Sequence, residues 1–166
     1  MSQGGILFIL MALAAHGEHV KAEEAERAQR VEQAERVEQA EITCLTQALY
    51  YEARGEGERG QEAVAEVILH RARSGLHPSS ICGVVHEPYQ FSFLRDGSMR
   101  RKLDWEAWET ANTLAARIMR GEIVTNITRS AMFYHAVNFQ PEWAKAMRPT
   151  AQIGNHVFYQ RASQKS

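Results

Sequence analysis

The sequence predicts an α+β fold that is mainly α-helical, with a small antiparallel β-sheet near the C-terminus. Two observations lead to this prediction. Apolar residues recur at helical spacing through residues 43–53, 61–73 and 104–120. Two short aromatic runs, 131–136 (AMFYHA) and 156–160 (HVFYQ), have the composition of strands. A content of 45% apolar and 23% charged residues is enough for a packed core.

Capping residues help to place the ends of these elements. A glycine-rich break follows the first helix. A further short helix is expected over 79–85, with Ser79 or Ser80 as its N-cap. Asp104 has the residue type and the position of an N-cap for the helix that follows it. The two aromatic runs are expected to form an antiparallel pair packed on the helices, with an irregular stretch between them.

The first 22 residues differ in character from the rest. Residues 6–15 (ILFILMALAA) form an apolar run that is short for a bilayer span but typical of the core of a secretory signal. A small-residue cleavage pattern follows at 20–22. We therefore expect residues 1–22 to be a signal peptide and the protein to be exported, periplasmic or associated with the cell wall. An uncleaved N-terminal anchor or an upstream start-codon artefact is the alternative.

Residues 23–41 form a charged segment of low complexity, with the direct repeat RVEQAE at 30–35 and 36–41. Their composition favours a helix. Small apolar residues recur at every third position, so they drift around a helix of 3.6 residues per turn and sustain no single face. This pattern predicts a solvated helical spacer, with a helix that binds a partner as the alternative. The globular domain is then expected over 42–161, followed by a tail at 162–166.

Composition also argues against several partners and cofactors. The formal net charge is −1 and no basic arm is visible, so nucleic acid is a poor partner. Cys44 and Cys82 allow one disulfide in an exported protein, with two buried free thiols as the alternative. The histidines of the globular part lack the compact spacing of a metal site. We therefore expect no metal and no cofactor. We also expect the protein to be a monomer.

The segment 49–60 (LYYEARGEGERG) is the strongest sign of catalytic chemistry. Ile42, Leu45, Leu49 and Glu52 share one helix face, which turns the Glu52 carboxylate inward. The negative end of the helix dipole and partial burial both raise the pKa of a carboxyl group. A raised pKa suits a proton donor near neutral pH, so Glu52 is the candidate general acid. A helix-end glutamate paired with an arginine is the alternative.

No second carboxylate stands out as a partner for Glu52, because Asp96 and Asp104 have the pattern of turn and cap residues. If the cleaved bond is glycosidic, one acid then has to serve as both acid and base. Aromatic faces and amide groups suit a groove for sugar rings. The candidate substrate contacts chosen on this basis, or for their closeness to Glu52, are Tyr51, Glu56, Gln90, Phe91, Ser92, Tyr134, His135 and Trp143. For His135, a hydrogen bond across the strand pair is the alternative.

Six motifs follow one another from about Cys44 to Tyr159: CLTQALYYEARGEGERGQEAVAEVILHR, HPSSICGVV, QFSF, FYHA, PEW and IGNHVFY. In their order and spacing they resemble the cell wall hydrolase family of the SleB and CwlJ spore-cortex enzymes. His70 stands where that family more often has asparagine. The resemblance implies a fold like that of the lysozyme-type lytic transglycosylases, and peptidoglycan as the substrate.

The resemblance also implies a role for Glu52, the glutamate of the YYEARGE motif. In such enzymes one glutamate protonates the glycosidic oxygen between N-acetylmuramic acid and N-acetylglucosamine, and then acts as a base toward the muramic 6-hydroxyl. The expected function is a lytic transglycosylase or muramidase. A zinc-dependent N-acetylmuramoyl-L-alanine amidase and a non-catalytic wall-binding module are the alternatives.

Overall fold

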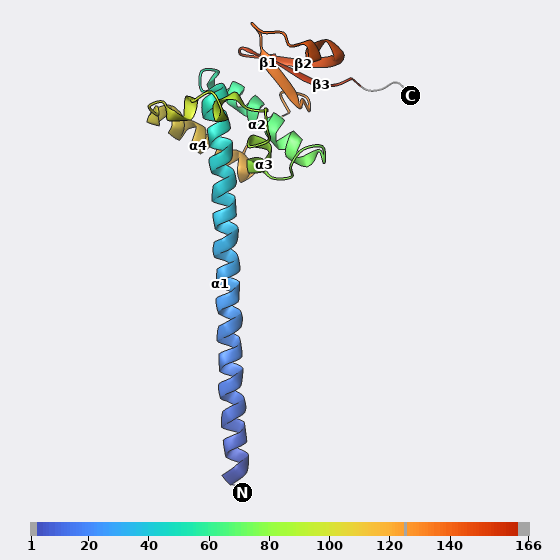
Figure 1. Cartoon of the computed structure of the whole chain (residues 1–166). Coiled ribbons are helices and arrows are strands. Elements are labelled where there is room, and N and C mark those ends of the chain that lie inside the picture. The colour runs from blue at the N-terminus through green and yellow to red at the C-terminus, as the bar shows by residue number, and fades with distance from the viewer. Residues whose placement is uncertain (1–2, 125, 163–166) are drawn as a thin grey trace. The chain divides into compact units, whose positions relative to one another are not determined.

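The structure, a computed structural model, describes residues 3–124 and 126–162, and their side chains from residue 18 onward. The chain divides into two compact units, Met1–Gln39 and Ala40–Ser166, which are described one at a time below. Helix α1 (Gln3–Ala53) contributes residues to both (Figure 1).

The first unit is helical and solvated, as predicted for the charged segment. The described side chains from residue 18 to 39 are all exposed. Ion pairs one turn apart join Arg30 to Glu26 and Arg36 to Glu32. Among the residues that the structure describes, no helix is both long and apolar enough to cross a membrane. The signal peptide stays a prediction, since the side chains of the apolar run lie outside the described ones.

Helix α1 continues to Ala53, where the sequence predicts that the first core helix ends. The spacer and the first core helix were expected as two segments, but they form one helix because no glycine or proline separates them. Gly57 follows with a φ of 69°, a left-handed conformation that favours glycine. This turn lets the chain reverse into the next helix directly after Ala53.

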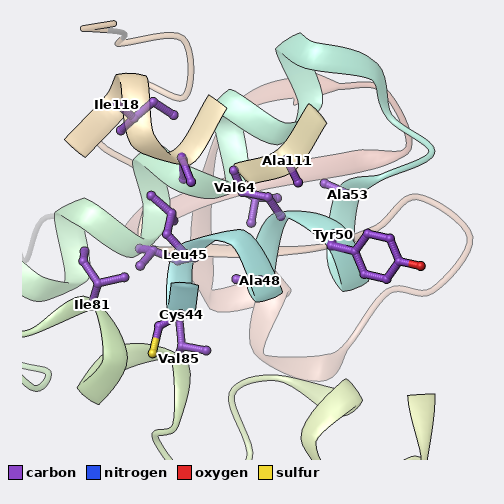
Figure 2. Close-up of a cluster of buried hydrophobic side chains, with 14 of the residues drawn as sticks. Cys44, Leu45, Ala48, Tyr50, Ala53, Val64, Ile81, Val85, Ala111 and Ile118 are labelled. Atoms are coloured by element: carbon purple, nitrogen blue, oxygen red, sulfur yellow. The ribbon is translucent and has the colours of Figure 1, made fainter. Parts of the chain in front are cut away.

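Helix α2 lies at the centre of the second unit. One of its faces packs with α1, α3 and α4 in an apolar cluster that includes Leu45 and Val64 (Figure 2). Its other face packs on the sheet through Val67, which contacts a second cluster around Phe158. The predicted central position of this helix is confirmed. The helices after α1 are α2 (Gly57–Arg73), α3 (Ile81–Val85) and α4 (Trp105–Met119), with 3-10 turns at Ser92–Leu94, Ser98–Arg100 and Glu142–Ala146.

Two predicted caps and the predicted disulfide are confirmed. The Ser80 hydroxyl accepts a hydrogen bond of 2.9 Å from the backbone N–H of Gly83 and caps α3. Asp104 accepts one of 3.2 Å from the backbone N–H of Ala107 and caps α4. The disulfide Cys44–Cys82 joins α1 to α3 across 38 residues of sequence.

The sheet has three antiparallel strands in the order β1–β3–β2 (Figure 1). The predicted pair is present, with Tyr134 opposite Phe158. The prediction of an irregular stretch between the two aromatic runs is wrong in part, because that stretch contains strand β2. Pro149 hides that strand in the sequence, and the edge position and a register shift after Pro149 accommodate it. The strands are β1 (Phe133–Ala136), β2 (Met147–Ile153) and β3 (His156–Arg161).

Candidate active site

Glu52 lies in the last turn of α1, and its side chain is half-buried. Burial is the main reason that the pKa of Glu52 rises to about 7. The hydrogen bond from Tyr134 and the positive charge of Arg71 lower this pKa, and the negative charge of Asp96 raises it. A carboxyl group with a pKa of about 7 is present in both its acid and its base form at neutral pH, as acid–base catalysis requires.

Tyr134 connects the sheet to Glu52. Its hydroxyl donates a hydrogen bond of 3.4 Å to Oε2 of Glu52. Its ring meets the His156 ring edge-on at 5.1 Å and lies tilted against the Phe158 ring at 5.6 Å. Burial, and then the charge of Glu52, raise the pKa of Tyr134 well above its ordinary value. The phenol therefore stays protonated and acts as a donor.

Arg71 of α2 is a buried cation near Glu52. Arg71 is 5% exposed, and its Nε donates a hydrogen bond of 2.8 Å to the carbonyl oxygen of Met132. The guanidinium carbon lies 5.9 Å from the centre of the Phe91 ring. Nη1 has no hydrogen-bond partner among the described residues. The positive charge favours the carboxylate form of Glu52.

Arg71 is not among the residues selected from the sequence. A signal was present, because Arg71 follows Val64 and Ile68 at helical spacings of seven and three residues and so belongs to the buried face of α2. An arginine on such a face has to find polar partners inside the protein.

Asp96 is a turn residue, as predicted, since its Oδ1 accepts a hydrogen bond of 2.8 Å from the backbone N–H of Ser98. Hydrogen bonds from Ser98 hold the pKa of Asp96 below its ordinary value. The structure adds a second property, because the negative charge of Asp96 acts on Glu52. The sequence offered no sign that this carboxylate lies near the candidate acid.

Glu56, a predicted substrate contact, is engaged within the protein. Its Oε2 accepts a hydrogen bond of 2.6 Å from the backbone N–H of Asn155, and its Oε1 accepts one of 3.1 Å from Nδ2 of the same residue. Burial raises the pKa of Glu56, but the Asn155 hydrogen bonds outweigh burial and the net pKa is lowered. A Cβ atom at Gly154 would collide with this carboxylate. Glu56 therefore holds the turn between β2 and β3 next to the start of α2.

His135 and Trp143, two other predicted contacts, are not brought to Glu52. Neighbouring residues of a strand point to opposite faces, so His135 points away from the face that Tyr134 uses. There Nε2 of His135 forms a hydrogen bond of 2.9 Å with the Tyr159 hydroxyl, and its ring lies 5.7 Å from that of Trp143. The alternative for His135, a hydrogen bond across the strand pair, is what the structure contains.

The remaining candidates lie on α1 and on the loop after α3. Tyr51 precedes Glu52, is half-buried and stacks on Phe93 at 4.9 Å. Gln90 and Ser92 are exposed. Phe91 is 1% exposed and belongs to the apolar core, so its ring does not offer a face to a sugar. Its aromatic side chain suggested a groove residue, but packing turns it inward.

No three His, Cys, Asp or Glu side chains in the described part of the chain gather into a group that could hold a metal ion. Fold and site together define a small, mainly helical domain in which burial raises the pKa of the half-buried Glu52 to about 7. The chain belongs to the Cell Wall Hydrolase family, whose profile matches residues 55–159. Glu52 lies just ahead of the matched range.

Two groups of similar proteins agree with this assignment. The chain is 34% identical to a spore cortex-lytic enzyme of Bacillus subtilis over 123 residues, which are 71% of this chain and 37% of the relative. It is 33% identical to a spore cortex-lytic enzyme of Oceanobacillus iheyensis over 124 residues, which are 71% of this chain and 41% of the relative. The chain thus spans about two-fifths of the length of these curated relatives.

Two solved structures of similar proteins are matched over nearly their whole length. The catalytic domain of the Bacillus cereus SleB protein has a TM-score of 0.61 and 31% identity, with 74% of this chain and 91% of that chain covered. The catalytic domain of the germination-specific lytic transglycosylase SleB from Bacillus anthracis has a TM-score of 0.60 and 30% identity. The match covers 72% of this chain and 93% of that chain. The family resemblance and the predicted fold class are confirmed.

Proposed function

We propose that this chain cleaves the glycan strands of peptidoglycan as a lytic transglycosylase, with Glu52 as its single acid and base. The observation that carries the proposal is the half-buried carboxyl group of Glu52 in the last turn of α1, whose Oε2 accepts a hydrogen bond from Tyr134 and whose pKa burial raises to about 7. Membership of the cell wall hydrolase family supports a wall substrate. Similarity to a catalytic domain described as a lytic transglycosylase supports this reaction over simple hydrolysis.

The reaction has two proton transfers. The protonated carboxyl group of Glu52 first donates its proton to the glycosidic oxygen between N-acetylmuramic acid and N-acetylglucosamine, as the bond from that oxygen to C1 breaks. The Glu52 carboxylate then takes the proton of the muramic 6-hydroxyl, as that oxygen bonds to C1. The product carries a 1,6-anhydro ring, no water is consumed, and Glu52 returns to its starting form.

Two neighbours suit this cycle. Tyr134 donates to Oε2 of Glu52 and so orients the carboxyl group. The positive charge of Arg71 favours the carboxylate that exists between the two transfers. Burial favours the acid that exists before the first transfer.

The test is Glu52→Gln, assayed on purified peptidoglycan with mass spectrometry of the products. We expect wild-type protein to release anhydro-muropeptides and the variant to lose about 10²- to 10⁴-fold in rate, the contribution typical of a general acid. Glu58→Gln is the matched control, because Glu58 is an exposed acid of α2 whose side chain is 64% accessible.

Each other outcome has a definite meaning. Full activity of Glu52→Gln contradicts the role of Glu52. Products with an ordinary reducing end, one water heavier, indicate a hydrolytic muramidase. Release of peptides with free amino groups indicates the amidase, and no fragments at all from wild-type protein indicate a wall-binding module.

We also infer that the protein acts outside the cytoplasm, in the periplasm or at the cell wall. The Cys44–Cys82 disulfide supports this location, since disulfides persist in oxidising compartments. The apolar run of residues 6–15 supports export as well. Cell fractionation tests it, and a wholly cytoplasmic protein with reduced cysteines would contradict it. The monomer and a partner for the helical spacer stay predictions.

A further inference from the structure

We propose that a cationic pocket at the Glu52 end of α1 binds a carboxylate of the peptide stem that N-acetylmuramic acid carries. This proposal rests on the proposed function, because it names the part of the same substrate that the pocket recognises. The pocket has a volume of about 230 Å³ and is lined by Tyr50, Tyr51, Arg54, Ser98, Arg101 and Lys102.

The lining of the pocket is positively charged. Three of its six residues are cations and none is an acid. In the described part of the chain, no ion pair holds Arg54, Arg101 or Lys102. Asp96 acts on Arg101 through space, but its carboxylate accepts a hydrogen bond from Ser98. Cations gathered in one concave site without a paired acid attract an anionic ligand.

Arg54 and Tyr50 are held in place for such a ligand. A nitrogen of the Arg54 guanidinium, Nη1, donates a hydrogen bond of 2.8 Å to the Tyr50 hydroxyl, and the guanidinium carbon lies 5.0 Å from the centre of the Tyr50 ring. The same hydroxyl accepts a hydrogen bond of 2.9 Å from the backbone N–H of Asp104. Tyr50 is 2% exposed, and its hydroxyl thereby fixes the position of the Arg54 guanidinium group.

The Tyr50 hydroxyl points away from the apolar cluster (Figure 2). Arg54 therefore offers its remaining N–H donors to the pocket. Carboxylates bind strongly to such charged, oriented donors.

The pocket lies at the end of α1 that also carries Glu52. Tyr51 directly precedes Glu52 in α1, and the loop that supplies Ser98 and Arg101 also carries Asp96, whose charge acts on Glu52. The volume is below that of clefts for drug-sized ligands, so it suits a carboxylate-bearing side chain and not a disaccharide. The muramic unit at the cleaved bond carries a peptide with several carboxylates, which makes the stem the fitting occupant.

The first experiment compares two substrates. The double variant Arg101→Gln/Lys102→Gln removes two pocket charges, and Arg95→Gln/Arg100→Gln is the matched control, because both of its residues are exposed on the same loop outside the pocket. We expect the pocket variant to cleave intact peptidoglycan about 10-fold more slowly at limiting substrate, the loss typical of a hydrogen bond to a charged group. On glycan strands stripped of peptides it should match the wild type. Equal losses on both substrates, or no loss on intact peptidoglycan, overturn the proposal.

The second experiment measures binding without catalysis. The full chain carrying Glu52→Gln is titrated with a soluble stem tetrapeptide, with and without the two pocket substitutions. We expect the pocket substitutions to raise the Kd about 10-fold, and an equal concentration of inorganic phosphate not to displace the peptide. Displacement by phosphate indicates a general anion site and overturns the proposal.

The two proposals fail in different ways. If the pocket substitutions leave the Kd for the stem peptide unchanged, only the proposal for the pocket is overturned. A wild-type protein that binds the stem through the pocket but never cleaves a glycan overturns the lytic function alone.

Discussion

The hydroxyl of Tyr134 donates a hydrogen bond of 3.4 Å to Oε2 of Glu52, between residues that are 82 positions apart in the chain. Glu52 lies in the last turn of a helix, and Tyr134 lies in a strand at the edge of the sheet. A hydrogen bond to a carboxylate favours the charged form, so Tyr134 opposes the effect of burial on Glu52. The pKa of about 7 is the balance of these opposing effects with the nearby charges.

Replacing Tyr134 with Phe removes this hydrogen bond and keeps the ring. The pKa of Glu52 then rises above about 7, because burial is less strongly opposed. Cleavage that needs the protonated acid persists to higher pH, so the alkaline limb of the pH–rate profile moves upward. Tyr89→Phe is the control, since Tyr89 is 82% exposed, and its profile should match the wild type. A limb that stays in place or moves downward contradicts the prediction.

Glu52 also makes the stability of the fold depend on pH. Its pKa rises from 4.5 to about 7 on folding, so between these values the folded protein binds more protons than the unfolded chain. The free energy of unfolding therefore falls as pH rises through this window, and it stays reduced above it. Glu52→Gln removes this loss. We expect the Tm difference, variant minus wild type, to be a few degrees larger at about pH 8 than at about pH 5 in calorimetry. The same difference at both pH values would show that the carboxyl group ionises without cost.

Asp96→Asn separates two mechanisms. The like charge of Asp96 raises the pKa of Glu52, so the variant should lose activity at a lower pH than the wild type. With one glutamate as acid and base, its rate below the Glu52 pKa stays close to that of the wild type and its products keep the anhydro ring. A loss of about 10²-fold or more at that pH would instead identify Asp96 as the second carboxylate of a hydrolase.

The Cys44–Cys82 disulfide should contribute strongly to stability. It closes a loop across 38 residues, which corresponds to about 3–4 kcal/mol in the chain-entropy account. Replacing both cysteines with serine should lower the free energy of unfolding by about this amount, measured by urea denaturation. A reductant should lower the wild-type midpoint and leave the variant unchanged. Equal midpoints for the oxidised wild type and the variant would contradict the prediction.

Glu56→Gln tests whether this residue holds a turn or binds the substrate. The variant weakens the two hydrogen bonds from Asn155, which should cost about 1 kcal/mol of stability. Thermal unfolding measures this loss. Because Asn155 already occupies the Glu56 carboxylate, we expect the KM of the variant for peptidoglycan to match that of the wild type. This KM is measured at a temperature well below the Tm. A raised KM with unchanged stability would restore Glu56 as a substrate contact.

Features set by neighbouring residues could be predicted from the sequence. The end of α1 at Ala53, the caps Ser80 and Asp104, and the inward direction of Glu52 all depend on spacing and residue type within a few positions. Strand β2 was missed because Pro149 breaks its local pattern, and only pairing with β3 makes it a strand.

By itself the sequence determined the helices, the candidate acid Glu52 and the family resemblance, because each of these is written in local spacing or in motif order. Only the tertiary structure decided which side chains meet Glu52. Tyr134 donates a hydrogen bond to Glu52, and the charge of Arg71 acts on it. His135 instead points to the other face of the sheet. The physical reason is strand register. A shift of one residue exchanges the two faces of a strand, and contacts across 82 residues, not local pattern, fix that register.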